Sequence, residues 1–238
     1  MESNDVTLNP TAIGRTLGVV AALLVLASTA GQLSTHLAGH DSVHGLVKLF
    51  YVDKEQNIPA FFSSALLLIA SLVLSVITLL ERKRKSARVL HWAILTFGFL
   101  FMSMDEAVSL HEMLNDPTHA LLGGGHLGVF YFTWVVAAIA VVLVLGVFFL
   151  GFVLRLPART RRRFLTAGTV YLSGVIGMEL IAGQYAETHG MVNLTYSMIS
   201  TVEESLEMAG VIIFITAALQ HLADHYKEVR FVLAGPSS

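Results

Sequence analysis

The chain contains no cysteine among its 238 residues. This absence excludes disulfide bonds, thiolate metal ligands, iron–sulfur clusters and thiol nucleophiles. Charged residues are also scarce, at 13% of the chain, whereas ordinary soluble domains hold about 25%. Basic residues form short clusters beside hydrophobic runs and no stripe interleaved with aromatics, so we expect no nucleic-acid partner.

Hydrophobic residues, by contrast, make up 55% of the chain, and the mean hydropathy is +0.70. A transmembrane helix needs about 20 mostly apolar residues. Six windows meet this requirement: residues 13–36, 59–80, 89–113, 127–154, 164–186 and 198–222. The start lacks the basic head and cleavage site of a signal peptide, so the first window should remain as a helix. We therefore predict an all-α, polytopic membrane protein, a six-transmembrane-helix bundle that forms one membrane domain over residues 1–238.

The basic residues predict the orientation of this bundle in its lipid bilayer. Thirteen of the fifteen lie on one side of the predicted membrane, chiefly in segments 82–88 and 155–163. The positive-inside rule makes that side cytoplasmic and places both termini there. Only Lys48 and Lys54 lie on the other side. We expect a multi-pass protein of a bacterial inner (plasma) membrane; its oligomeric state is unknown from the sequence.

Six carboxylates lie inside, or at the rim of, three hydrophobic windows that hold no lysine or arginine beside them. They are Asp105, Glu106, Glu179, Glu203, Glu204 and Glu207. A carboxylate near the bilayer centre costs roughly 2.5–3.5 kcal/mol. The last window has only 12 apolar residues between Met208 and Leu219, about 18 Å of helix against a hydrocarbon core of about 30 Å. Its three glutamates must therefore lie within the hydrocarbon or just above it.

Counting from the basic anchors gives these acids a common height. Asp105 lies 17 residues beyond Arg88, and Glu179 lies 16 beyond Arg163, so both stand about 25 Å from the inner surface. Glu203 and Glu207 share one helix face, because they are four residues apart. By the same spacing, Asp105, Ser109 and Glu112 should share one stripe. The sequence thus predicts that three helices carry acids into one outward-facing layer.

The residue types in this layer suit a divalent metal ion. The segment SMDEAVSLHE (103–112) adds His111 and Glu112 to the acids, and VEESLE (202–207) supplies three glutamates. Oxygen and imidazole donors suit zinc, iron or manganese, and the sequence does not say which. His36, His40 and His44 recur every four residues and would share a face on a continuing helix. The predicted metal ligands are Asp105, Glu106, His111, Glu112, Glu203, Glu207, His36 and His40. No Glu-x-x-His occurs, which counts against a standard di-iron site.

Asp53, Glu55 and Asn57 alternate in the loop before the second window, as oxygen ligands of a hard cation do. No EF-hand glycine or terminal glutamate accompanies them. We therefore interpret this segment as a solvated loop.

Three functions remain open for an outward-facing intramembrane site of carboxylates and histidines. The first is a membrane-embedded metalloenzyme that acts on a lipid or another hydrophobic small molecule, with Glu179 and Glu204 as catalytic carboxylates, one serving as general base. The second is a cation or proton-coupled transporter, and the third is a non-catalytic subunit that docks through its acids. Whether the chain is an enzyme is therefore uncertain from sequence. The one-sided placement of the polar residues favours the metalloenzyme, because transporters need access from both sides.

Overall fold

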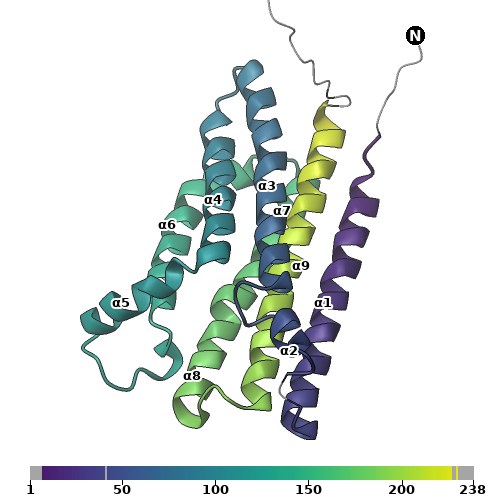
Figure 1. Ribbon diagram of the computed structural model, residues 1–238. Coiled ribbons are helices and arrows are strands. Elements are labelled where there is room, and N and C mark those ends of the chain that lie inside the picture. The colour runs from purple at the N-terminus through teal and green to yellow at the C-terminus, as the bar shows by residue number, and fades with distance from the viewer. Residues whose placement is uncertain (1–6, 41, 227–228, 230–238) are drawn as a thin grey trace, which may run out of the picture.

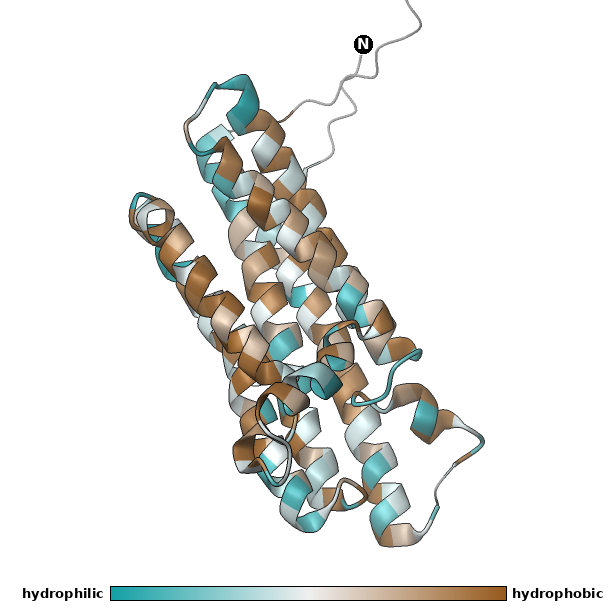
Figure 2. Ribbon diagram, turned by 90° about the vertical axis from the view of Figure 1, so that its left-hand side faces the viewer, coloured by the Kyte–Doolittle hydropathy of each residue, from teal (hydrophilic) through white to brown (hydrophobic). Residues whose placement is uncertain are grey.

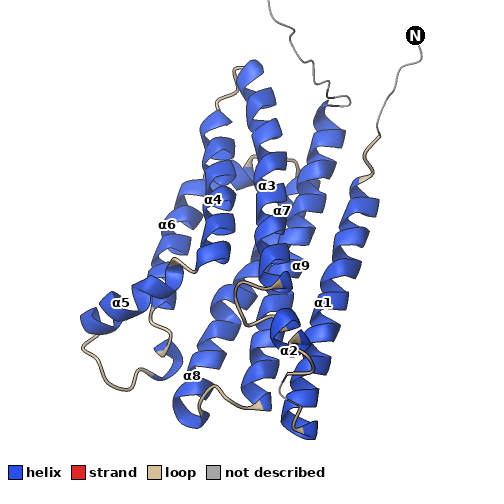
Figure 3. Ribbon diagram, in the orientation of Figure 1, coloured by secondary structure: helices blue, strands red, loops and turns tan. Residues whose placement is uncertain are grey.

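The computed structural model describes residues 7–40, 42–226 and 229, and this part of the chain is helical with no strand (Figure 3). The α-helices are α1 (Pro10–Ala38), α2 (Leu46–Phe50), α3 (Ile58–Lys83), α4 (Val89–Val108), α5 (Asn115–Leu121), α6 (Trp134–Leu154), α7 (Ala158–Leu172), α8 (Glu179–His189) and α9 (Leu194–Tyr226). Two 3₁₀ turns, η1 (His111–Leu114) and η2 (Gly128–Phe130), and a π-helical turn, η3 (Ser173–Met178), connect some of them. The all-α prediction is confirmed.

The helices mark the chain as a membrane protein. Five of them are long and apolar enough to cross a bilayer: α1, α3, α6, α9 and the continuous run Ala158–His189. A sixth span results if α4 and His111–Leu121, which meet at 84°, together form one broken element. Figure 2 shows hydrophobic residues along the middle of the helices and hydrophilic residues gathered toward the two ends of the bundle.

Local sequence signals explain where the long helices begin and end. Asn9 caps α1 by accepting hydrogen bonds from the N–H groups of Thr11 and Ala12, and Asn57 caps α3 in the same way. Gly39 ends α1 in the left-handed conformation, with φ of 68°. The helix therefore stops before His40, and the continuing helix on which His36, His40 and His44 would share one face does not form.

Helix α9 is the centre of the bundle and packs against α1, α3, α7 and α8, while α3 also packs along α4 (Figure 1). At one end, Arg84 donates to the carbonyl of His225 (3.2 Å) and stacks over the ring of Tyr226 (4.1 Å). Arg159 lies 4.0 Å from Asp224 at the same end. Segments 82–88 and 155–163 thus share one end of the bundle, here called the basic end; the opposite end is the acidic end.

The half of the bundle toward the basic end has a conventional apolar core. Leu66, Ala70, Leu74 and Ile77 line one face of α3 at intervals of three or four residues, and each is at most 1% exposed. Trp92, also 1% exposed, packs edge-on against two phenylalanine rings and beside the ring of His221. This core joins α3, α4, α6, α7 and α9.

Two predicted windows differ from the structure. The window 89–113 is interrupted, because Ser109 adopts the left-handed conformation (φ of 53°) and donates its N–H to the carbonyl of Asp105. The chain then turns into η1, where Glu112 is exposed. The predicted stripe of Asp105, Ser109 and Glu112 is therefore wrong. In the window 127–154, the helix begins only at Trp134, whose N–H donates to Asn115 Oδ1 (3.0 Å).

Candidate functional site

Acids from three helices converge at the acidic end of the bundle. Glu207 of α9 lies near enough to Glu106 of α4 and Glu179 of α8 for their charges to interact. Glu204 likewise lies near Glu106 and Glu179. All of these side chains are half-buried. We call the six carboxylates Asp105, Glu106, Glu179, Glu203, Glu204 and Glu207 the acid layer.

Within the acid layer, Glu179 and Glu203 lie near enough for their carboxyl groups to interact directly. Two adjacent carboxylates in a poorly hydrated site either share a proton or need a cation between them. Among the residues that the structure describes, no lysine or arginine forms an ion pair with any member of the acid layer. The compensating charge must therefore be a proton, His111 or a bound cation.

A chain of contacts crosses the acid layer from α4 to α8. Asp105 accepts the backbone N–H of His111 (2.7 Å) on one oxygen and contacts the ring Nδ1 of His111 (2.9 Å) with the other. A carboxylate can only accept, so the neutral imidazole carries its proton on Nδ1 and leaves Nε2 free as a donor atom for a metal. The His111 ring packs 4.5 Å from Trp134, whose Nε1–H donates to Glu179 Oε1 (2.8 Å).

The π-helical turn η3 lies directly before Glu179 and packs against α9. A Cβ on Gly174 would lie 2.9 Å from the carbonyl oxygen of Glu203 and 2.9 Å from Cγ of Glu207. Only glycine permits this approach, which presses the backbone of η3 onto the two glutamates. Such π turns within α-helices occur frequently at functional sites. No pattern in the sequence predicted this turn.

The loop before α3 is solvated at Lys54, Glu55 and Gln56, as we expected, whereas Asp53 is half-buried beside the acid layer. Asn57 donates to the carbonyl of Tyr51 (2.6 Å) while it caps α3, and Asp53 lies near Glu204. Burial raises the pKa of Asp53 above its usual value, although the Ser200 and Tyr51 hydroxyls favour its charged form. Glu55 lies near Glu112, His111 and Asp105. The sequence analysis did not count Asp53 and Glu55 among the candidate site residues. The alternation of Asp53, Glu55 and Asn57 was the signal that could have identified them.

Two buried serines beside the acid layer have unused hydrogen-bonding capacity. Ser109 is 8% exposed and Ser200 is 2% exposed. Ser109 Oγ has no hydrogen-bond partner among the described residues, and Ser200 Oγ makes no hydrogen bond of good geometry there, although it lies close enough to Asp53 to favour the charged form of that carboxyl group. Ser200 lies beside Asp53, and Ser109 lies in the turn between Asp105 and His111. Buried hydroxyls are usually paired, so both are candidates for contact with a ligand or water.

The predicted metal ligands fall into two groups. The structure brings Asp105, Glu106, His111, Glu203 and Glu207 together, with Glu112 nearby at the surface. His36 and His40 lie at the end of α1, and no hydrogen bond or ion pair between described residues joins either to an acid. Across residues 7–40, 42–226 and 229, no group of three or more histidine and acidic side chains has the arrangement of a metal site. Metal binding therefore stays a prediction.

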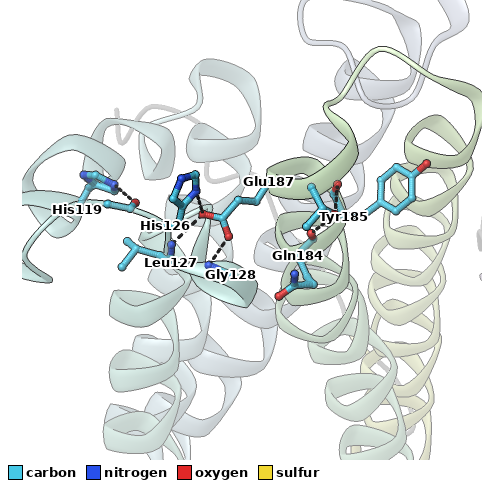
Figure 4. Close-up of polar contacts among 9 residues, drawn as sticks. His119, His126, Leu127, Gly128, Gln184, Tyr185 and Glu187 are labelled. Carbon is cyan, nitrogen blue, oxygen red and sulfur yellow. Dashed lines mark hydrogen bonds and ion pairs between the residues drawn. The ribbon is translucent and has the colours of Figure 1, made fainter.

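Another half-buried carboxylate, Glu187 of α8, has a structural role (Figure 4). It accepts hydrogen bonds from the backbone N–H groups of Leu127 (2.9 Å) and Gly128, and it contacts Nδ1 of His126 (3.1 Å). His119 in turn lies 3.4 Å from the carbonyl of Gly125 through Nε2. These contacts tie the loop between α5 and α6 to α8. Glu187 is thus structural, and it does not belong to the acid layer.

Fold and site together define an integral membrane helical bundle with an acid-lined site among its helices. The chain belongs to a family described as Domain of unknown function (DUF8692), whose model matches residues 16–222. This range contains the whole acid layer and the loop that holds Asp53. No curated protein and no solved structure matches the chain.

Proposed function

We propose that the chain is a membrane-embedded metalloenzyme that acts on a lipid or another hydrophobic substrate and holds a divalent ion in the acid layer. The observation that carries this proposal is the convergence of carboxylates from α4, α8 and α9 without a lysine or arginine partner among the described residues. The basic end lies in the cytoplasm, with both termini and six spans, and the acidic end faces outward from a bacterial inner membrane.

The donor set fits a divalent ion such as zinc, iron or manganese. Asp105, Glu106, Glu203 and Glu207 offer carboxylate oxygens, and His111 offers Nε2. A bound ion would supply Lewis acidity toward a carbonyl or phosphoryl group, or toward water. Glu204 lies near these ligands and acts as the general base. Trp134 holds Glu179 in place through its indole N–H, so Glu179 stays directed toward Glu203.

A cation or proton-coupled transporter is the second candidate, because the helices are broken at the site. Helix α4 bends at Ser109, and the run Ala158–His189 contains the π turn η3. Discontinuous helices commonly form the binding sites of transporters. Against this, the half of the bundle toward the basic end is filled by Trp92, Phe152 and Phe164, which offer no polar path.

Metal analysis of the protein purified in nanodiscs tests the proposal. We expect stoichiometric zinc, iron or manganese in the native chain. Glu203→Gln and Glu207→Gln should lose the metal while their circular dichroism stays unchanged. Asp116→Asn is the matched control, because this exposed acid lies outside the acid layer.

Native protein that folds but binds none of these ions would overturn the metalloenzyme proposal and favour a docking subunit. Metal that accumulates inside proteoliposomes, instead of staying bound to the protein, would favour the transporter.

A further inference from the structure

Helix α6 stands partly away from the rest of the bundle. Its principal packing partners are η1, α5 and η3 near its first residues, and it regains contact near its end through Phe152, which packs on Trp92. Between these two anchor points lies a cavity of about 350 Å³ that is bounded by α4, α6, α7 and α9. A cavity of this size lies within the range of small-molecule sites, roughly 300–1,000 Å³.

The lining of this cavity is apolar, and its walls continue into the acid layer. On α4, the lining residues Leu95, Phe99 and Met102 lie on one helix stripe, and the next position of that stripe is Glu106. On α9, the lining residue Val211 is followed one turn farther out by Glu207. The helix faces that line the cavity therefore carry acids at their outer ends.

Tyr171 joins the two regions. Its side chain lines the cavity and packs against Gly210, where a Cβ would lie 2.7 Å from the Tyr171 Cβ. Its phenol lies near enough to Glu207, Glu106 and Glu204 for their charges to influence it. Tyr171 thus lies between the apolar cavity and the acid layer.

We infer that this cavity binds a single-chain amphiphile with a primary amine head group. The hydrocarbon chain lies in the cavity beneath α6, and the amine reaches past Tyr171 toward the acid layer. The sign of the head group follows from charge complementarity, because no lysine or arginine forms an ion pair with the acid layer among the described residues.

The lipid-facing side of α6 gives the hydrocarbon chain of the amphiphile a route into the cavity. Val144 and Val147 of α6 are 69% and 79% exposed, and the middle of the helix makes few contacts with its neighbours. A molecule dissolved in the bilayer can therefore enter sideways, without passing through water. The inference rests on the acid layer of the proposed function and adds the substrate class.

Photolabelling tests the inference in phosphatidylcholine nanodiscs. The probe is a long-chain primary amine with a diazirine in its chain, compared with the alcohol and the carboxylic acid of equal length. We expect the amine to label α4 and α6 preferentially. Gly146→Leu should weaken this labelling roughly tenfold, because leucine displaces about two methylenes from the cavity. Gly146 lines the cavity, and a Cβ there meets no atom within 4 Å.

Gly151→Leu is the matched control, because Gly151 lies on the same helix, has equally open surroundings and does not line the cavity. Gly168→Leu fills the cavity from α7 and repeats the test should Gly146→Leu fail to fold. Equal labelling of the cavity-filling and control variants would overturn the placement of the chain. Equal labelling by amine, alcohol and acid would overturn the choice of head group.

Metal content measured on the same samples separates the two proposals. Loss of labelling in Gly146→Leu with unchanged metal content supports binding of the hydrocarbon chain in the cavity, independently of the metal. A native protein without metal that still prefers the amine would overturn the metalloenzyme and leave the amphiphile site standing.

Discussion

The two halves of this bundle differ in the regularity of their helices and in the kind of side chain that their helices bring together. Toward the basic end, the helices are regular and enclose an apolar core around Trp92. Toward the acidic end, α4 bends, the run after α7 passes through a π turn, and carboxylates face one another. Regular helices that bury apolar side chains are sufficient to stabilise the fold. Within the described membrane-spanning helices, the bend in α4 and the π turn both lie beside the gathered acids, which indicates that these distortions serve the site.

The largest expected effect comes from the basic half. Trp92→Ala removes a side chain that packs against Phe152, Phe164 and His221, and we expect a loss of about 3 kcal/mol in the free energy of unfolding. Denaturant unfolding in detergent micelles measures it. Where the variant is still folded, its metal binding should match the native protein. A loss of metal affinity in folded protein would mean that the two halves are not independent.

A smaller effect is expected at the π turn. Gly174→Ala places a methyl group against the Glu203 carbonyl and the Glu207 side chain, and overpacking of this kind costs about 1–3 kcal/mol. It should also move the two glutamates apart from Glu179 and lower metal affinity. Gly177→Ala is the control, since its Cβ would meet only Ser173 at 4.0 Å. Equal stability and affinity in both variants would show that the close approach at Gly174 has no role.

The smallest effect concerns the pH dependence of stability at Asp53. Its pKa is raised from 3.8 in the folded chain, chiefly by burial. The folded state then holds the proton more tightly than the unfolded state, so ionisation favours unfolding. The stabilising contribution of the protonated form is complete below pH 3.8 and disappears as the pH rises through the raised value.

Asp53→Asn removes this pH dependence. We expect the variant to gain stability relative to the native chain between about pH 4 and pH 7, and to match it at lower pH. Thermal unfolding across this range provides the measurement. A native chain that becomes more stable than the variant as the pH rises would contradict the sign of the shift.

Much of the fold could be predicted from hydropathy, because a membrane span needs a long apolar run and the chain has several. The gathering of acids could be anticipated from their distance along the helices to the basic anchors. The bend at Ser109 could not, since a serine in the left-handed conformation carries none of the signals that glycine or proline give. The positions of Asp53 and Trp134 depend on contacts between segments far apart in sequence, and no local pattern encodes them.

The π turn before Glu179 has a geometric consequence for everything that follows it. One additional residue in a helical run rotates the succeeding side chains by about 100° around the axis, because each residue advances the helix by that angle. The direction in which Glu179 points is therefore fixed by the length of the segment from Ser173 to Met178 as well as by its own identity. Deleting a single residue there would rotate this carboxylate away from Glu203 while every residue of the acid layer keeps its identity.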